Sequence, residues 1–508
     1  MANTVLLPEE KKQLRSVILA SSVGTLIEWY DFFIFGSLAT ILSTQFFPSA
    51  NPTAAFLSTL ATFAAGFVVR PFGAIVFGRL GDLVGRKYTF LVTLVLMGGS
   101  TFAIGLVPGY ASIGIFAPIL VVSFRLLQGL ALGGEYGGAA TYVAEHAPAD
   151  RRGFYTSFIQ TTATLGFFVS LGVILGVRQW MGVDEFNDWG WRIPFLLSAL
   201  LVGVSVYIRL KMQESPLFLK IKKEGKISSN PIRESFGKSE NLFLVLIALF
   251  GAAAGQGVVW YTGQFYALSY IQKTCNIEFV QSYQLLAVAL VLGTPLIILF
   301  GSWSDTFGRK YIMLGGMLLA VICYRPIYRQ MYDISRVPPG LEIVAGRSIQ
   351  RETSFTAGGD TLRITTSERF FSNENKLVEV QREKKGVITE TRKEVVLGRR
   401  QQVLMVGLIF IQLVFVAMAY GPIAAFLVEM FPTRIRYTSM SLPYHIGNGI
   451  FGGLTPFLAT VLFERSKAPG NPGGDVLAGL WYPITVAAIT VIVGMIFLSN
   501  KRKGDVQE

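Results

Sequence analysis

The sequence has few of the residue types on which soluble proteins and enzymes depend. Only 15% of its 508 residues are charged, against about 25% in a typical soluble domain, whereas 52% are hydrophobic. This balance excludes a water-soluble globular protein and predicts a chain whose apolar surface faces lipid. The two cysteines, Cys275 and Cys323, form no spaced set for a metal ion or a disulfide framework.

Motifs of the main pump and enzyme classes are missing as well. The phosphate-binding pattern GxxxxGK[ST] that an ATP-driven pump needs does not occur. With only His146 and His445 in the chain, no metal-ligand spacing or nucleophile motif is present. We therefore expect no enzyme activity, no metal, no cofactor other than a coupling proton, and no nucleic-acid partner.

Twelve apolar segments of about 20 residues, the length that a hydrocarbon core of about 30 Å requires, predict an all-α integral membrane protein with 12 transmembrane helices. The first segment follows charged residues without a small-residue cleavage site, so we expect it to be retained rather than removed as a signal peptide. The segments are 17–41, 54–77, 88–107, 113–142, 154–177, 193–210, 241–269, 281–301, 311–331, 403–430, 438–462 and 479–499.

A charged ten-residue motif occurs once in each half of the chain. Residues 78–87 (GRLGDLVGRK) and 301–310 (GSWSDTFGRK) share Gly, Asp, Gly, Arg and Lys at equivalent positions. A repeat in matching context predicts a duplication and two pseudo-symmetric six-helix halves. The expected parts are an N-terminal half (1–210), a cytoplasmic linker (211–240), spans seven to nine (241–332), an insert (333–402), spans ten to twelve (403–500) and a short tail (501–508).

Basic residues gather on one side of the predicted bundle. The ten-residue motifs, the linker and the two chain ends carry most of them, whereas the short loops of the other side hold only Arg178, Arg192, Lys273, Arg465 and Lys467. Because short cytoplasmic loops are enriched in Lys and Arg, both termini are predicted to be cytoplasmic. We expect a multi-pass protein of the cell (inner) membrane that functions as a monomer in the lipid bilayer.

The insert at 333–402 is too polar to cross a membrane. From Asp82 to Glu145 the first half spans 63 positions, whereas from Asp305 to Glu429 the second spans 124, and the surplus of 61 marks an addition. The topology places it outside the cytoplasm, and alternating residues in 360–366, 376–382 and 387–391 predict short strands. We expect a small β-rich extracytoplasmic insert; a flexible surface loop without function is the alternative.

Carboxylates recur before a proline at the cytoplasmic ends of spans four, six and ten, and two of them precede a pair of arginines. We expect these groups to exchange partners with the ten-residue motifs and to form a cytoplasmic gate; simple anchoring at the lipid headgroups is the alternative. Exposed ion pairs contribute only about 0–1 kcal/mol each, so several must act together. The proposed set is Asp82, Arg86, Glu145, Arg152, Glu214, Asp305, Arg309, Glu429 and Arg434.

The repeated motifs resemble the conserved loop of the major facilitator superfamily. Further strings resemble its metabolite:proton symporter branch, which carries α-ketoglutarate, citrate, shikimate and proline or betaine: EWYDF (28–32), RPFG (70–73), RLLQG (125–129), GGE (133–135), WYT (260–262) and FPTR (431–434). The resemblance covers nearly the whole chain and implies a non-enzymatic transporter. The insert is not typical of the branch, and the tail after Lys503 is too short for the coiled coil of some osmosensing members.

Few charged residues remain inside the predicted spans, where a charge is costly and usually serves a pathway. Glu28 and Asp31 lie on one face of span one, and Arg125 lies at similar depth in span four. A carboxylate that faces an arginine can lose its proton while paired and regain it when the arginine is drawn to an anionic substrate. The resemblance implies this role for Asp31 and Arg125; a permanent structural ion pair is the alternative.

Glu135 is expected to be a second proton site nearer the cytoplasm. The alternative is a packing role, because Gly129, Gly133 and Gly137 form a small-residue line that lets a neighbouring helix approach. Polar residues of spans two, four, seven and eleven are the candidates for substrate contact, with helix packing or snorkelling as the alternative for several of them. They are Arg70, Gln128, Gln256, Tyr261, Gln264, Tyr444, His445 and Asn448.

Together these features predict a secondary active transporter that imports a small organic acid with a proton by alternating access. A zwitterionic osmolyte such as proline or betaine is the alternative substrate. A channel and a sensor that has lost transport are further alternatives, but two matched halves favour alternating access over a fixed pore.

Overall fold

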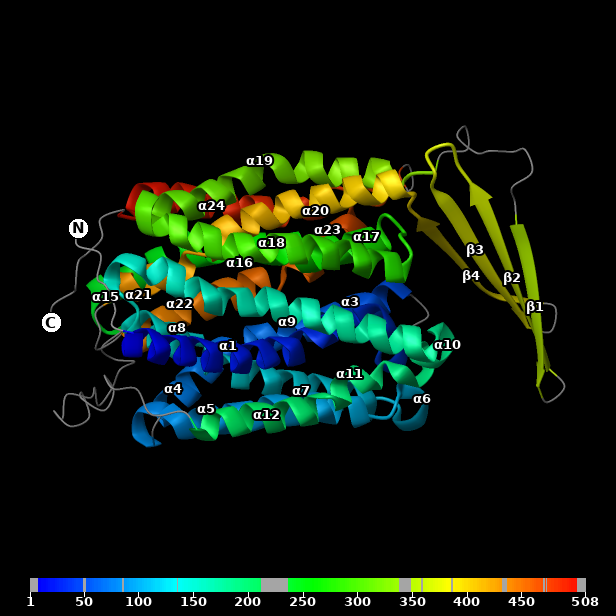
Figure 1. Ribbon diagram of the computed structural model, residues 1–508. Helices are drawn as coiled ribbons and strands as arrows, with labels where there is room; N and C mark the ends of the chain where they lie inside the picture. Colours follow the sequence, from blue (N-terminus) through cyan, green and yellow to red (C-terminus); the bar gives the residue numbers. More distant parts are fainter. Residues whose placement is uncertain are drawn as a thin grey trace.

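The computed structural model describes residues 8–48, 52–84, 86–134, 136–211, 236–337, 349–357, 360–384, 387–431, 436–468, 471 and 473–499. Long helices run side by side in an elongated bundle, and a small sheet projects from one end (Figure 1). The first turn of α1 (Pro8–Ser37) and the last turn of α24 (Trp481–Phe497) lie at the opposite end. We call these the sheet end and the terminal end.

The first part of the bundle is built from helices that precede residue 212. Prolines lie at several of the breaks between them, because proline lacks the amide proton that a helix interior needs. They are α1, α2 (Ala39–Phe46), α3 (Pro52–Val68), α4 (Arg70–Val84), α5 (Arg86–Leu106), α6 (Tyr110–Ile113), α7 (Phe116–Gly133), α8 (Tyr136–His146), α9 (Arg152–Met181), α10 (Val183–Glu185), α11 (Arg192–Leu196) and α12 (Ser198–Lys211).

The second part follows residue 235. Its first long helix contains two π-helical turns, η3 (Leu249–Ala253) and η4 (Thr262–Tyr266), and a third π-helical stretch is η6 (Ile446–Gly452). Such turns are frequent at functional sites. The α-helices are α15 (Ser239–Ala248), α16 (Ala254–Tyr261), α17 (Ala267–Lys273), α18 (Phe279–Phe307), α19 (Arg309–Ser335), α20 (Arg399–Tyr420), α21 (Ile423–Met430), α22 (Arg436–His445), α23 (Thr455–Arg465) and α24.

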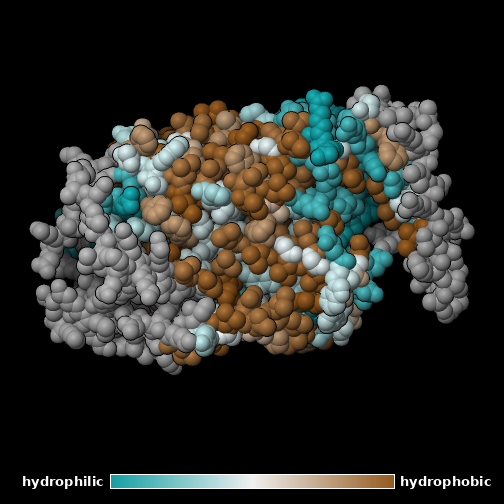
Figure 2. Space-filling view, viewed as in Figure 1, coloured by the Kyte–Doolittle hydropathy of each residue, from teal (hydrophilic) through white to brown (hydrophobic). Residues whose placement is uncertain are grey.

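Nine helices in the described residues are long and apolar enough to cross a membrane, and the number is eleven if each of two bent pairs is one crossing. The bends are 63° between Ser21–Ser37 and Ala39–Phe46, and 47° between Val183–Gly190 and Arg192–Tyr207. The predicted segment 88–107 coincides with α5, whose apolar part, Leu91–Leu106, is shorter. Hydrophobic side chains cover the flank of the bundle (Figure 2), which suits a surface in contact with lipid.

Four antiparallel strands form the sheet, in the order β1 (Ile349–Ala357), β2 (Asp360–Phe370), β3 (Lys376–Lys384) and β4 (Val387–Val396). β2, β3 and β4 include the three alternating segments noted above, whereas β1 was not expected. A register shift between Arg382 and Glu383 interrupts the pairing of β3 with β4.

Glycines on α7 allow helices of the first part to approach one another closely. A Cβ atom at Gly129 would lie 1.8 Å from the carbonyl oxygen of Gly66, and one at Gly133 would lie 2.1 Å from that of Arg70. The small-residue line of the sequence therefore packs α7 against α3 and α4. This packing places Arg70 and Arg125 in the interior.

Candidate substrate site and terminal-end gate

Arg70 is the first residue of α4 and is completely buried. Its guanidinium carbon lies 4.1 Å from the ring centre of Phe67, 4.4 Å from that of Phe32 and 5.2 Å from that of Trp29. None of its three guanidinium nitrogens has a hydrogen-bond partner among the described residues. Arg70 is therefore a buried cation that is held by aromatic rings rather than by a carboxylate.

A second buried guanidinium, that of Arg125 on α7, lies 3.7 Å from the ring centre of the same Phe32. Its Nη1 atom donates to the carbonyl oxygen of Phe32 at 3.0 Å and to Oε1 of Gln128 at 2.8 Å. Gln128 in turn donates to Thr101 Oγ1 at 2.7 Å. These bonds fix the arginine, while its Nε and Nη2 atoms have no partner in the described part of the chain.

Two cations thus share one aromatic cluster, and no ion pair joins either of them to a described carboxylate. A buried charge costs several kcal/mol unless it is paired and hydrogen-bonded. Cation–π contacts offset about 0.5–2 kcal/mol of this cost each. They supply no hydrogen-bond acceptor, however, so three nitrogens of Arg70 and two of Arg125 have no acceptor among the described residues. This arrangement is suited to an anion that brings its own oxygens.

Asp31 lies on another face of α1. Its Oδ1 atom accepts a 2.5 Å hydrogen bond from Ser198 Oγ on α12, and its Oδ2 atom has no partner among the described residues. A Cβ atom at Gly98 of α5 would lie 3.3 Å from Oδ2. The structure therefore places Asp31 between α5 and α12 and does not bring it into an ion pair with Arg125; Glu28, also buried, lies three residues before it.

Residues of α16 and η4 form the facing wall in the second part of the bundle. The Trp260 ring stacks on Phe33 at 5.3 Å between centres, and the Tyr261 ring meets Phe67 edge-on at 5.0 Å. Gln256 Oε1 accepts from Asn448 Nδ2 at 2.9 Å, so two of the substrate candidates contact each other. The Nε2 atom of Gln256, Trp260 Nε1 and both amide atoms of Gln264 are buried without partners among the described residues.

A group of tyrosines joins α8 and α9 of the first part to α20 and α22 of the second. The rings of Tyr136 and Tyr444 stack at 3.6 Å, and the Tyr444 hydroxyl lies 3.3 Å from that of Tyr420. Gln160 accepts from the Tyr136 hydroxyl at 3.1 Å and donates to the Tyr420 carbonyl at 3.2 Å. His445 contributes a ring edge-on to Tyr444, with centres 5.5 Å apart.

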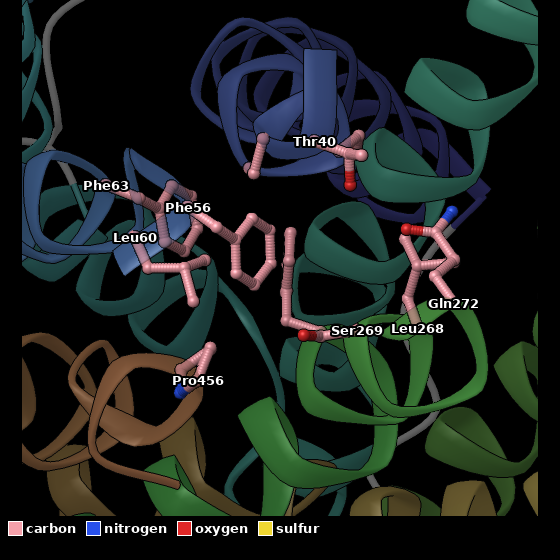
Figure 3. A pocket seen from close by; sticks show the side chains of 12 residues that line it. Thr40, Phe56, Leu60, Phe63, Leu268, Ser269, Gln272 and Pro456 are labelled. Carbon is pink, nitrogen blue, oxygen red and sulfur yellow. The ribbon is translucent and has the colours of Figure 1, made fainter. Parts of the chain in front are cut away.

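A small hollow lies between the two parts of the bundle near the sheet end (Figure 3). Thr40, Ser269 and Gln272 give it polar groups, and aromatic and aliphatic side chains supply the rest. Phe63 and Phe265, whose rings lie 5.2 Å apart, belong to its lining. The Phe63 ring also lies 4.8 Å from the Arg125 guanidinium carbon, so this ring contacts both the hollow and Arg125.

At the terminal end, a network of hydrogen bonds and ion pairs joins α18, α19 and α21. Asp305 accepts from the backbone amides of Gly153 and Phe154, each at 2.8 Å, and so caps the first turn of α9. Arg309 donates to Asp305 at 3.1 Å and forms a bidentate pair with Glu429, with both bonds at 2.6 Å. Carboxylates stabilise helix N-termini because the exposed amides carry partial positive charge.

Three of the nine predicted gate residues, Asp305, Arg309 and Glu429, therefore form one connected network. No hydrogen bond or ion pair joins the Arg152 side chain to these three residues in the described part of the chain. The remaining predictions cannot be placed: Glu135, Glu214 and Arg434, with the side chains of Asp82, Arg86 and Glu145, lie outside the described residues.

Several site residues were missed by sequence reasoning. The rings of Phe32, Phe63 and Phe67 contact the arginines, and Ser198 donates to Asp31. The tyrosine group also includes Tyr136, Tyr420 and Gln160. Aromatic residues are common in membrane helices, so their number carried no signal. Only the EWYDF string, which places Trp29 and Phe32 beside Asp31, pointed to them.

Apolar helices, a hollow between two parts and a buried charged centre describe a membrane transporter of solutes. The chain belongs to the sugar (and other) transporter family of the major facilitator superfamily, a group of transporters and not of enzymes; residues 17–244 match that family. It is a multi-pass membrane protein that transports small-molecule metabolites.

Curated relatives cover most of the chain. The inner membrane metabolite transport protein YhjE of Escherichia coli is 34% identical over 448 residues, which are 88% of this chain and 87% of the relative. The proline/betaine transporter of Salmonella typhimurium is 30% identical over 95% of this chain and 83% of its own. The citrate-proton symporter of Salmonella typhi is 29% identical over 90% of this chain and 89% of its own.

Solved structures show the same fold. The proton:xylose symporter XylE, bound to 6-bromo-6-deoxy-D-glucose, superimposes with a TM-score of 0.67 over 96% of this chain and 95% of its own, at 16% identity. At this identity the likeness concerns the fold alone.

Proposed function

We propose that the protein is a proton-coupled symporter that imports a small organic acid by alternating access. The observation that carries this proposal is the set of five guanidinium nitrogens on Arg70 and Arg125 that lack acceptors in the described part of the chain. Hydrogen bonds to charged groups are worth about 1.5–3 kcal/mol each. A carboxylate at this place would offset much of the cost of burying two cations.

Asp31 is the proposed proton carrier, with Glu28 beside it and Glu135 as a second site. Asp31 has one fixed oxygen, on Ser198, and one oxygen free of described partners, where a proton can be held. Phe32, the next residue, touches both arginines. A movement of α1 on anion binding would therefore reach Asp31 directly, without an ion pair to Arg125.

A zwitterionic osmolyte is the second candidate. Trp260 and Phe265 present aromatic rings near Phe33, and such rings bind quaternary ammonium groups. The relationship to proline/betaine transporters points the same way. Two arginines without a described carboxylate partner favour a net anion over a neutral zwitterion.

The wider arrangement is part of the proposal. We infer twelve crossings, with the bent pairs and α5 each counted once, in two six-helix halves at 1–210 and 241–500 joined by the 211–240 linker. Both termini are placed in the cytoplasm, the sheet of the 333–402 insert outside it, and the chain as a monomer in the inner membrane. The positive-inside bias and the family relationship support this arrangement.

Uptake by proteoliposomes tests the coupling. An imposed inward pH gradient is expected to drive saturable accumulation of the substrate, and Asp31→Asn is expected to abolish accumulation while leaving substrate binding and exchange partly intact. Ser198→Ala is the matched control, because it removes only the hydrogen bond to Asp31 and is expected to slow uptake without abolishing it. Undiminished uphill uptake by Asp31→Asn, or ohmic flux in the parent, would contradict the proposal.

Substrate class is tested by a thermal-shift screen of the purified protein with citrate, α-ketoglutarate, shikimate, proline and glycine betaine. Stabilisation by citrate, α-ketoglutarate or shikimate, and not by proline or glycine betaine, is expected. Stabilisation by betaine or proline alone, with uptake that rises with external osmolality, would establish the osmolyte alternative instead.

A further inference from the structure

The root of the sheet is hydrogen-bonded to the helices that follow the hollow-lining α17. Strand β4 pairs with the α17–α18 loop, since Val395 N donates to Asn276 O at 2.7 Å and Glu278 N donates to Val395 O at 2.9 Å. The buried Gln281 on α18 accepts from Leu397 N at 2.7 Å and donates to Leu397 O at 3.1 Å. These hydrogen bonds attach the sheet to the N-terminal end of α18.

A second attachment joins the sheet to α19. The fully buried Asn375, which precedes β3, donates to Ile334 O at 2.9 Å and accepts from Gly398 N at 3.1 Å. All partners of the sheet root named so far belong to the second part of the bundle. The sheet and that part are thus expected to move as one body.

The loop held by β4 presents a docking point to the first part of the bundle. Glu278 caps α18, with its carboxylate oxygens accepting from Val280 N at 2.9 Å and Gln281 N at 2.7 Å. The next residue, Phe279, lies under Arg178 of α9, whose guanidinium carbon is 4.0 Å from the ring centre.

Arg178 is 5% exposed, and its Nε has no partner among the described residues. The charges that act on it come from Glu278 and from Arg392 and Glu394 of β4, which form a 2.5 Å ion pair with each other. Arg178 therefore contacts the α18 N-terminus and lies within electrostatic range of β4.

α9 and α18 are antiparallel neighbours that are joined at both ends. At the terminal end, Asp305 near the end of α18 caps the start of α9, as described above. At the sheet end, Arg178 near the end of α9 stacks on the start of α18. We call these the terminal-end contact and the sheet-end contact. In an alternating-access cycle each would have to break while the other holds.

We propose that the sheet insert controls this balance: by fixing the loop that carries Glu278 and Phe279, it stabilises the sheet-end contact and so favours the conformation that is closed at the sheet end. Arg178 and Gln281 act as positioning residues for this closure and do not touch the substrate. The proposal rests on alternating access but not on the identity of the substrate or of the coupling ion.

Thiol labelling of the full-length protein tests the proposal without a transport assay. In a background with Ser in place of Cys275 and Cys323, a reporter is introduced in the hollow as Ser269→Cys, and its rate of reaction with a bulky maleimide is measured in detergent. Arg178→Leu and Gln281→Leu are each expected to raise that rate by about 2- to 30-fold, the range of population shift that loss of one cation–π contact allows.

Two controls separate a shifted equilibrium from general loosening. Arg329→Leu, which removes an exposed arginine paired with Asp333 on α19, is expected to leave the rate unchanged. Asp305→Asn, which weakens the terminal-end contact, is expected to lower the rate below that of the parent, whereas a loosened fold would raise it.

An increased rate with Arg178→Leu but not with Gln281→Leu would overturn the role of the sheet, as would an increased rate with Asp305→Asn. Unchanged labelling in both variants, together with normal pH-driven uptake, would refute the sheet proposal and leave the proposed function standing. The expected labelling pattern without pH-driven uptake would refute the proposed function and leave the sheet proposal standing.

Discussion

Arg70 offers a test in which stability and ligand binding are expected to change in opposite directions. The Arg70→Met variant keeps an unbranched apolar stem against Phe32, Phe67 and Trp29 and removes only the charged head. Replacement of buried ionic groups by apolar side chains of similar volume often stabilises by about 1–4 kcal/mol. The three rings share a single guanidinium, so the lost cation–π attraction is counted once and subtracts about 0.5–2 kcal/mol. The ligand-free variant is therefore expected to be more stable by about 1–2 kcal/mol.

Binding is expected to weaken by a larger amount. A carboxylate that accepts two hydrogen bonds from the guanidinium would lose about 3 kcal/mol or more, which corresponds to an affinity at least about 100-fold lower. The signs differ because the buried charge is unfavourable in the empty site and favourable once an anion is present. A residue with a purely structural role would lower stability and affinity together.

The assay is thermal unfolding of the purified protein, with and without a saturating carboxylate found in the substrate screen. Arg70→Met is expected to raise the midpoint of the ligand-free protein and to abolish the ligand-induced increase. Arg329→Met, the same chemical change at a side chain that is 59% exposed, is expected to alter neither quantity. A ligand-free variant less stable than the parent, or one that keeps the full ligand-induced increase, would refute this reasoning.

Two further predictions concern the framework. Burial raises the pKa of the Cys275 thiol to about 12, so almost no thiolate is present at neutral pH. Cys275 in the folded parent is therefore expected to resist alkylation at pH 7–8 until the protein is denatured. Rapid modification at this position, detected by mass spectrometry, would contradict the burial. A Cβ atom at Gly129 would meet a backbone carbonyl at 1.8 Å, whereas one at Gly172 would meet nothing within 4 Å. Gly129→Ala is therefore expected to lower the thermal unfolding midpoint strongly, and Gly172→Ala is expected to leave it nearly unchanged. Equal effects of the two substitutions would disprove close helix packing at Gly129.

The course of the chain through the bundle could be predicted because apolar runs of fixed length dominate the sequence. The segments expected at 154–177 and 281–301 lie within α9 and α18, and both helices run several residues beyond them. The 63° bend at Leu38 was not predicted, since no proline marks it. Nor were the π-helical turns η3, η4 and η6, which leave no pattern in hydrophobicity.

The site was predicted as a list of residues and not as a set of contacts. Arg70, Arg125 and Gln128 were recognisable because charged and amide groups are costly in a membrane. Their partners were not, because a helix that is apolar on all sides gives no indication of its rotation about its own axis. Asp31 and Arg125 lie at similar depth, yet α1 turns the carboxylate to Ser198.

The gate illustrates the same limit. The repeated motif singled out Asp305 and Arg309, and the structure joins Arg309 to Glu429. The main acceptor role of Asp305, however, is toward two backbone amides of α9. Backbone groups are identical in every residue, so such contacts have no signature in the sequence.

The projecting sheet has a practical consequence for imaging. A transporter of 55.8 kDa embedded in a detergent micelle offers little outside the micelle by which single particles can be oriented. Here four strands stand clear of the apolar belt at one end of the bundle (Figure 1), and Gln281 and Asn375 fix their root to the helices. The protein therefore carries its own fiducial marker, and an antibody fragment raised against the sheet would enlarge that marker without covering the lipid-facing surface.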